Sequence, residues 1–222
     1  MHDFLAARAS LDPGAWRALE RALDALRSGG LPCGSCLVDS DGNVIAEGRN
    51  HAYDPVSGSD LLEQTPLAHA ELNVLARVSS DRDLGRDTLW STQQPCSMCT
   101  AAIQFCGVGN TRYLAADPAF LGTDDVRAGK IVDPTLGDPT LGPWAVLATL
   151  MFLHPAIEHA GANSPRVQRN RLLEPEATDL ALAVHNEQQF SATTDGLDDV
   201  AAGLWSRLHA VSEARSRRLA KR

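Results

Sequence analysis

The sequence predicts an α/β fold: a three-layer α/β/α sandwich with a mixed, about five-stranded sheet, plus a helical C-terminal extension. One observation is the hairpin signal Asp41-Gly42, which lies between two short apolar runs and indicates an antiparallel strand pair. A second is the succession of strand, helix and strand with short joints within 88–115, which is typical of a parallel crossover unit. Helices on both faces would bury such a mixed sheet, which gives three layers.

Each element has its own local signal. Asp12-Pro13 supplies an N-cap and a first-turn proline, and Trp16, Leu19 and Leu23 then recur at helical spacing. Thr65-Pro66 indicates a second helix start. The expected elements are a helix from Asp12-Pro13 to Gly29-Gly30, strands at 35–38 and 44–47, a helix from Thr65-Pro66 to about Ser79-Ser80, a strand at 88–92, a helix from Pro95 to Cys106, a strand at 111–115, and three later helices at 144–154, 174–184 and 197–211.

The chain is predicted to have two parts. Residues 1–118 contain all the expected strands and form the core of the fold. Residues 119–222 form a long connection and a helical extension that we expect to pack on this core. The stretch from Asp117 to Pro143 is rich in Gly, Pro and Asp and lacks periodicity, so we expect it to lie across a pocket.

Composition indicates an ordinary soluble globular protein, with 44% hydrophobic and 22% charged residues in a chain of 222. Five cysteines is an odd number, and no charged segment followed by an apolar run opens the sequence, so neither a disulfide framework nor secretion is indicated. The longest apolar run, Trp144 to Leu153, is too short to cross a bilayer and is expected to be a buried or interface helix. We therefore expect a cytoplasmic protein with no membrane partner.

The balance of charge argues against a polyanionic partner, because the formal net charge is -8. A small molecule is therefore expected as the partner over nucleic acid. One feature favours RNA, a basic cluster at the C-terminus that consists of Arg215, Arg217, Arg218, Lys221 and Arg222. A basic last turn also complements a helix dipole, and we expect this cluster to remain solvated.

Two short motifs predict the chemistry, His69-Ala70-Glu71 and Pro95-Cys96-Ser97-Met98-Cys99. Cys96 and Cys99 are three residues apart, so both thiols share one face of a helix that starts at Pro95. His69 and Glu71 cannot share a helix face, but both reach one metal-bound water if the site faces the helix end. Three His/Cys ligands with a nearby carboxylate fit a catalytic zinc, which keeps a fourth position open.

His-x-Glu followed by Pro-Cys-x-x-Cys is the signature of the zinc nucleobase deaminases. Over about residues 12–118 the chain resembles this zinc-dependent cytidine deaminase-like superfamily, in "HAELNVL" and "STQQPCSMCTAAIQFCGV", and is most similar to the branch of guanine deaminases and tRNA adenosine deaminases. The resemblance implies zinc-dependent hydrolytic deamination of a nucleobase or nucleoside, with a purine such as guanine or adenine favoured and ammonia released. Glu71 would be the general acid and base.

The resemblance also implies substrate contacts and an oligomeric state. Asn50, which follows the second strand in "EGRNHAYDP", would contact the base, and backbone groups of Ala70 would meet the ring. Asp117 follows the last core strand, where related guanine deaminases place a carboxylate near the pocket. Related enzymes commonly form homodimers, and the apolar helix from Trp144 is a candidate surface. Gln94-Pro95-Cys96 departs from the usual Glu-Pro-Cys, which weakens the transfer of an exact substrate.

Two alternatives remain open at this point. In the first, the chain is a tRNA adenosine deaminase or another RNA-binding deaminase that docks RNA through its basic C-terminus. In the second, it is a non-catalytic structural zinc protein, because Cys33-Gly34-Ser35-Cys36 is a second C-x-x-C pair that could complete a four-thiolate site with Cys96 and Cys99. Packing is the default role for Cys33 and Cys36.

Overall fold

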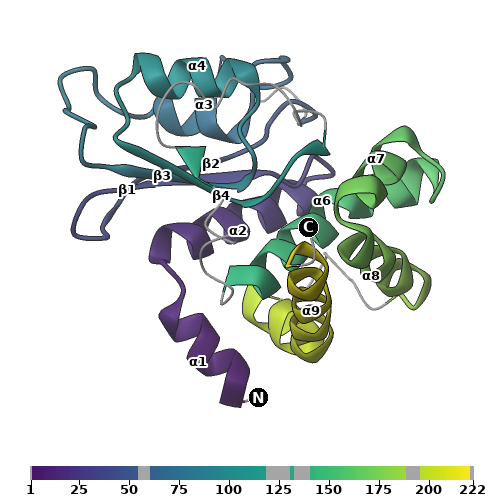
Figure 1. The fold of residues 1–222 in the computed structure, drawn as a ribbon. Coiled ribbons are helices and arrows are strands. Elements are labelled where there is room, and N and C mark those ends of the chain that lie inside the picture. Colours follow the sequence, from purple (N-terminus) through teal and green to yellow (C-terminus); the bar gives the residue numbers. More distant parts are fainter. Residues whose placement is uncertain (1, 55–60, 119–130, 133–140, 189–195, 221–222) are drawn as a thin grey trace.

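The computed structural model describes residues 2–54, 61–118, 131–132, 141–188 and 196–220. A mixed sheet lies between two layers of helices, with α3 and α4 on one face and α2 and α6 on the other (Figure 1). This is the predicted three-layer α/β/α sandwich with a helical C-terminal extension. No helix in these ranges is both long enough and apolar enough to cross a membrane.

The sheet has the strand order β2-β1-β3-β4-β5. Strand β1 pairs antiparallel with β2 and with β3, whereas β3 pairs parallel with β4 and β4 pairs parallel with β5. Four strands have five or six residues and the fifth has two, close to the expected count of about five. The strands are β1 (Gly34–Val38), β2 (Val44–Arg49), β3 (Thr88–Gln93), β4 (Asn110–Ala115) and β5 (Ile131–Val132).

Alternation along β1 divides the core into two clusters. Cys36 and Val38 belong to the cluster on the α2 side, whereas Leu37 belongs to the cluster on the α3 and α4 side. Helix α2 (Pro13–Arg27) approaches β1 very closely, since a Cβ on Gly34 would lie 2.0 Å from the carbonyl oxygen of Ala18. Only glycine therefore permits this contact.

The two motif helices are shorter than predicted. Helix α4 spans Ser97–Phe105, close to the expected range, but α3 spans only Ala70–Leu75. The predicted start at Thr65-Pro66 is wrong because these residues form a turn. The hydroxyl of Thr65 donates to the carbonyl oxygen of Leu62 and accepts from the backbone N–H of Leu67, so it closes a local loop.

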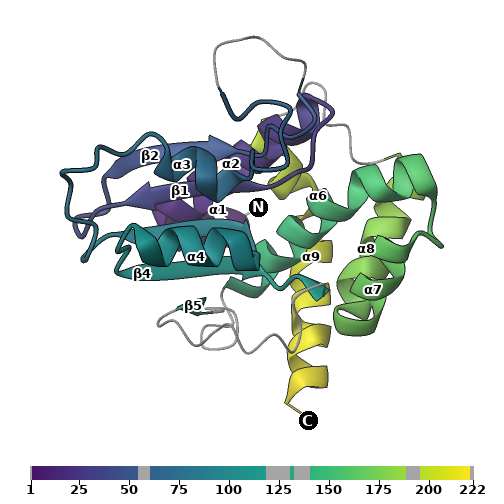
Figure 2. The ribbon, with the colours of Figure 1, turned by 90° about the horizontal axis from the view of Figure 1, so that it is seen from above.

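The C-terminal extension consists of α6 (Gly142–Ala160), α7 (Pro165–Leu173), α8 (Pro175–Asn186) and α9 (Leu197–Leu219). Figure 2 shows α6 between the sheet and the pair formed by α7 and α8. Trp144 of α6 packs edge to face on Trp16 of α2, with ring centroids 5.7 Å apart, and both belong to one hydrophobic cluster with residues of β3 and β4. The extension thus shares a core with the sheet, while the division of the chain at residue 118 stays a prediction.

Two helices were not predicted, and one prediction about α6 is wrong. Helices α1 (His2–Ser10) and α7 lack a strong apolar stripe, although Phe4 of α1 packs at 5.5 Å on the ring of Trp205. Helix α6 continues through Pro155 instead of ending at His154. Trp144 is 1% exposed, so this helix is buried, which is one of the two roles predicted for it, and it does not form the candidate dimer surface. Most of the connection 117–143 lies outside the described residues.

The basic C-terminal cluster is largely tied to acidic residues. The guanidinium of Arg215 is buried and donates from Nε to both carboxylate oxygens of Glu174, at 2.9 and 2.7 Å. Arg218 donates to Glu176 at 2.8 Å. The expectation that this cluster remains solvated is therefore wrong for Arg215, which joins α9 to the start of α8. Lys221 and Arg222 lie outside the described residues.

This ion pair gives a testable prediction for stability. Glu174→Gln keeps the size of the side chain but leaves the buried guanidinium of Arg215 without its carboxylate, so the free energy of unfolding should fall by about 3–5 kcal/mol. Glu176→Gln is the matched control, because its partly exposed pair with Arg218 should contribute at most about 1 kcal/mol. Urea denaturation of both variants measures the difference. Equal small effects would show that the buried pair is not needed for stability.

Candidate functional site

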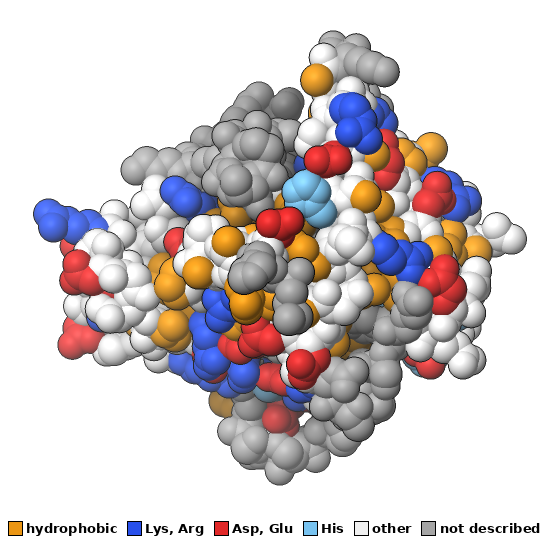
Figure 3. Space-filling model, turned by 90° about the horizontal axis from the view of Figure 1, so that it is seen from below, with side chains coloured by type: hydrophobic (Ala, Val, Ile, Leu, Met, Phe, Trp, Pro, Cys, Tyr) orange, Lys and Arg blue, Asp and Glu red, His pale blue; other side chains and the backbone are white. Residues whose placement is uncertain are grey.

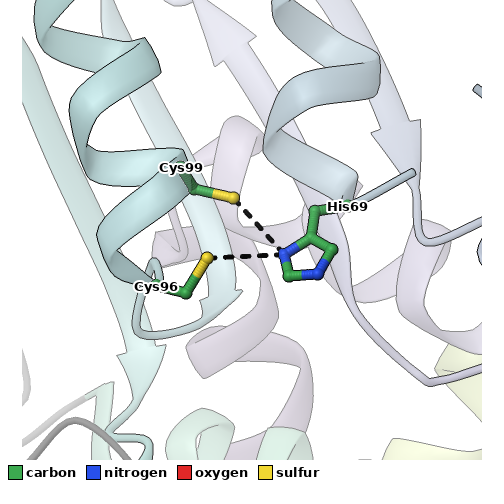
Figure 4. Close-up of side chains that lie close together, drawn as sticks. All are labelled: His69, Cys96 and Cys99. Atoms are coloured by element: carbon green, nitrogen blue, oxygen red, sulfur yellow. Dashed lines mark hydrogen bonds between the residues drawn. The ribbon is translucent and has the colours of Figure 1, made fainter. Parts of the chain in front are cut away.

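Two helix starts bring three metal-binding side chains together. His69 is the N-cap of α3 and Cys96 is the N-cap of α4, with Cys99 one turn further along. The Nδ1 atom of His69 lies 3.5 Å from the sulfur of Cys96 and 3.4 Å from the sulfur of Cys99 (Figure 4). The ligand atoms all lie within 4.8 Å of one another, and the searched, described residues hold no second such group of His, Cys, Asp or Glu.

These distances fit a tetrahedral zinc ion. With Zn–N of about 2.0 Å and Zn–S of about 2.3 Å, tetrahedral angles separate nitrogen from sulfur by about 3.5 Å. The separations of His69 Nδ1 from the two sulfurs match this value without movement of either helix. Three ligands leave one tetrahedral position for water or substrate, which is the arrangement of a catalytic rather than a closed structural site.

The local structure explains why the ligands are available. Neither His69 nor Cys96 uses its side chain to cap its helix, so both side chains remain free to face the metal position. A hydrogen bond from the thiol of Cys99 and a second from His69 lower the pKa of Cys96 to about 4. The same bond to Cys96, together with burial, raises the pKa of Cys99. One thiolate is therefore already favoured before a metal binds, in agreement with its place at a helix N-terminus.

Glu71 lies beside this cluster and is 6% exposed. Its Oε1 accepts a hydrogen bond of 3.0 Å from the hydroxyl of Ser91 on β3, and its Oε2 lies 3.5 Å from the sulfur of Cys99. Burial raises the pKa of the Glu71 carboxyl, while hydrogen bonds from its own backbone and from Ser91 act in the opposite direction. A buried carboxyl with a raised pKa binds a proton more readily than an exposed one, which suits a group that accepts and then donates a proton.

A cavity of about 320 Å³ opens beside the cluster. His69, Glu71 and Cys96 line it, and so do the three residues that we expected to contact substrate, Asn50, Ala70 and Asp117. The structure therefore brings these predicted residues to one space, although Asn50 and Glu71 are 21 positions apart and Asp117 lies much later in the chain. Their roles toward a substrate stay predictions.

Asn50 is held at the cavity by contacts that the sequence did not reveal. Its Oδ1 accepts from the backbone N–H of Ala52, at 3.0 Å, which leaves the amide nitrogen for a ligand. Arg49 forms a two-bond ion pair with Asp54, at 2.9 and 2.5 Å, which fixes the start of the following loop. The amide of Asn73 donates to the carbonyl oxygen of Arg49 at 2.8 Å and so ties α3 to the end of β2.

Asn73 and Ser91 are therefore positioning residues that sequence reasoning missed. Asn73 is fully buried in a helix start, and a buried amide at such a place is a signal that it bonds the backbone of a neighbouring segment. Ser91 lies in the middle of a buried strand, where a hydroxyl also needs a partner. The partner of Asn73 is on β2 and the partner of Ser91 is on α3, so neither can be identified without knowledge of how α3 packs on the sheet.

The second C-x-x-C pair does not join the metal group. Cys36 is fully buried and belongs to the hydrophobic cluster between the sheet and α2. Cys33 lines the cavity, and burial raises the pKa of its thiol well above the usual range. The four-thiolate structural site is therefore wrong, since the group within metal-binding distance consists of His69, Cys96 and Cys99.

Sequence comparison identifies relatives that match about half of the chain. Residues 15–115 match the family described as the cytidine and deoxycytidylate deaminase zinc-binding region. The chain is 32% identical to the cytosine deaminase of Candida albicans over 111 residues, which cover 48% of this chain and 67% of that protein. It is 34% identical to the tRNA-specific adenosine deaminase of Haemophilus influenzae over 103 residues, which cover 45% of this chain and 55% of the relative. The matches thus span about two-thirds or less of these relatives.

Solved structures give a similar picture. The guanine deaminase from Bacillus subtilis has 31% sequence identity and a TM-score of 0.39, over 50% of this chain and 69% of that one. A structure from a study of tRNA:A34 deaminases has 28% identity and a TM-score of 0.43, over 53% of this chain and 94% of that one. Helices α6 to α9 lie after the end of the family match at residue 115.

The geometry predicts which cysteines hold metal. His69→Ala or Cys96→Ser should release zinc, because two ligands cannot complete the site. The double variant Cys33→Ala/Cys36→Ala is the matched control and should retain the zinc of the unaltered chain. Elemental analysis after dialysis measures the metal content, and circular dichroism checks that each variant is folded. Loss of zinc from the control with its fold intact would contradict this ligand assignment.

Proposed function

Since the chain belongs to the cytidine and deoxycytidylate deaminase zinc-binding family, we propose that it hydrolyses the exocyclic amino group of a nucleobase or nucleoside and releases ammonia. The observation that carries this proposal is a three-ligand zinc site and a buried carboxyl, Glu71, on the wall of one cavity. A purine such as guanine or adenine is the favoured ring. Zinc is the cofactor of this family, and the nitrogen and sulfur atoms of the site fit it.

The chemistry needs an activated water and a proton carrier. When bound at His69, Cys96 and Cys99, zinc would lower the pKa of a coordinated water to about 7. Glu71 carries two protons in turn, the first from water to the ring nitrogen and the second from the added hydroxyl to the departing amino group. The C–N bond breaks, a C=O bond forms and ammonia leaves. Ser91 keeps the carboxyl of Glu71 oriented through its hydrogen bond.

Three residues would orient the ring. The free amide nitrogen of Asn50 can donate to a ring or carbonyl acceptor, because its oxygen is already bonded to Ala52. The backbone of Ala70, at the first position of α3, lies between the ligand His69 and the proton carrier Glu71. Asp117 can accept a hydrogen bond from an exocyclic amino group across the cavity. A few such bonds decide which base is accepted.

A small substrate is favoured over tRNA by the state of the basic C-terminus. The guanidinium groups of Arg215 and Arg218 are paired with Glu174 and Glu176, so the charges expected to dock RNA are largely neutralised. On the face seen in Figure 3, basic side chains lie beside acidic ones instead of forming one uniform basic patch. A tRNA adenosine deaminase is the second candidate function, because tRNA-specific adenosine deaminases are among the relatives of this chain. The competition experiment below tests it.

A cytoplasmic location and a homodimeric state also belong to this proposal. None of the five cysteines forms a disulfide, and two of them are the proposed zinc ligands, which suits a reducing compartment. Phe105 at the end of α4 is 92% exposed, which favours α4 over α6 as the candidate dimer surface. Sedimentation would determine the oligomeric state.

The role of Glu71 gives a direct test. Glu71→Gln should lower the turnover of an amino-substituted base or nucleoside by about 10²–10⁴-fold, the usual contribution of one acid and base group, and should retain zinc. Ammonia release over a panel of bases and nucleosides measures the rate. Glu213→Gln, on the exposed side of α9, is the control and should keep the full rate. A near-full rate in Glu71→Gln would rule out this assignment.

A competition experiment separates small substrates from RNA. We expect added tRNA to leave the deamination of a free base or nucleoside unchanged at low salt, since Arg215 and Arg218 are paired with carboxylates. The assay compares ammonia release with and without tRNA, and a gel shift reports binding directly. Salt-dependent binding of tRNA with inhibition of the small-molecule reaction would favour the RNA candidate instead.

A further inference from the structure

A second cavity, of about 500 Å³, adjoins the cavity at the zinc site. The two share four lining residues, Leu31, Tyr53, Arg166 and Arg169. The two arginines come from α7, which lies after the end of the family match at residue 115. The extension therefore supplies side chains to the same space as the predicted catalytic residues.

The second cavity has a positive lining. Glu71 and Asp117 line only the first cavity, whereas the described residues that line the second include Arg166, Arg169 and His159 and no Asp or Glu. This is a local exception in a chain whose formal net charge is -8. A cavity of one sign of charge raises the local concentration of ligands of the opposite sign.

The two shared arginines have no acidic partner among the described residues. Arg169 donates from Nε to the carbonyl oxygen of Pro165, at 3.2 Å, and the guanidinium of Arg166 lies 5.2 Å from the ring centroid of Phe152. Arg171, on the same helix, instead forms an ion pair with Asp179 at 2.5 Å. Arg166 and Arg169, which line the cavities, are thus the arginines of α7 without a carboxylate partner in the described part of the chain. A planar guanidinium can donate two parallel hydrogen bonds to phosphate oxygens.

Ser164 provides an independent observation at the same place. It is the N-cap of α7, it is 7% exposed, and it is one of the residues that line the second cavity, while its side chain does not cap the helix. The hydroxyl has no hydrogen-bond partner among the described residues. A buried, unpartnered hydroxyl beside two arginines at the start of a nine-residue helix is a set of donors that fits an anionic group.

We propose that the substrate is a nucleoside monophosphate, whose base lies at the zinc site and whose phosphate binds Arg166 and Arg169 near Ser164. The proposal rests on the deaminase function proposed above and narrows its substrate. A free base would carry no anionic group for these arginines, whereas the phosphate of a nucleoside monophosphate supplies one. Arg166 lines the first cavity together with His69 and Glu71, so its guanidinium and the predicted catalytic residues border the same space.

The first test compares nucleosides with their 5′-monophosphates in the zinc-loaded full chain. Binding is measured by calorimetry in Glu71→Gln, in which turnover should be about 10²–10⁴-fold slower, and ammonia release is measured in the unaltered chain. The monophosphate should bind roughly 10- to 100-fold more tightly than the nucleoside, the range of hydrogen bonds to a charged group. Equal affinities for the pair would overturn the proposal.

Variants locate the phosphate. Arg166→Gln should remove most of the preference for the monophosphate and leave nucleoside binding unchanged, and Arg166→Lys should restore part of it. Arg171→Gln is the matched control on the same helix and should keep the full preference. If Arg166→Gln weakened both ligands equally, the residue would have a structural role and the proposal would be wrong.

Two further experiments distinguish this proposal from a free-anion site and from a tRNA-binding site. Inorganic phosphate should compete with the monophosphate for binding to the unaltered chain. If phosphate binds but nucleotides bind no more tightly than nucleosides, the arginines bind free anions and the substrate assignment is wrong. Binding of tRNA that is lost in Arg166→Gln, without binding of mononucleotides, would also overturn it. If nucleosides are deaminated but their monophosphates bind no more tightly, the substrate assignment is wrong and the proposed deaminase function still holds. If monophosphates bind but no compound releases ammonia, both the deaminase function and the substrate assignment are wrong, and the arginines form only an anion-binding site.

Discussion

The convergence of two helix N-termini on one point is the constraint on which the rest of the structure depends. His69 and Cys96 are both N-cap residues, and neither side chain forms a capping hydrogen bond with its own helix. The parallel pairing of β3 with β4 places α4 on the same face of the sheet as α3. A shift of either helix start by one residue would move a ligand away from the others, since successive helical residues differ by about 100°.

Placing Glu71 beside these ligands has an energetic cost that the fold offsets. Removing a carboxylate from water is unfavourable by several kcal/mol, and a second negative group, the thiolate of Cys96, lies nearby. Hydrogen bonds from the hydroxyl of Ser91 and from the backbone N–H of Glu71 offset part of this desolvation cost. The pKa of the carboxyl is still raised, because the cost of burial is the larger effect. A carboxyl that is destabilised as an anion is also a better proton carrier, so the cost and the proposed chemistry have the same origin.

Local signals allowed much of the fold to be predicted, and long-range contacts explain the rest. Asp12-Pro13 and Asp41-Gly42 each act within a few residues, and the elements they indicated are present. Thr65-Pro66 misled because its hydroxyl bonds within a turn instead of capping a helix, a choice that depends on the preceding loop. Helix α7 was missed because only Val167 and Asn170 are buried in it, so its sequence has no apolar period. Spacing predicted that His69, Cys96 and Cys99 would lie together, and they do. Ser91 and Arg166 are brought to the same region only by the tertiary fold.

The shared core makes the extension part of the site rather than an appendage. Helix α6 buries Trp144 and Leu147 against the same cluster that holds Trp90 of β3, so α6 cannot move without opening the core. Phe152 of α6 lines the zinc cavity and lies under the guanidinium of Arg166, which extends this rigid packing to α7. A helix fixed in this way can hold an arginine at a set distance from a base bound at the zinc, because the side chain is pre-organised and little ordering is left for binding. A loop at the same place would lose conformational entropy each time a ligand bound, so recognition by α7 depends on the hydrophobic contacts that anchor α6.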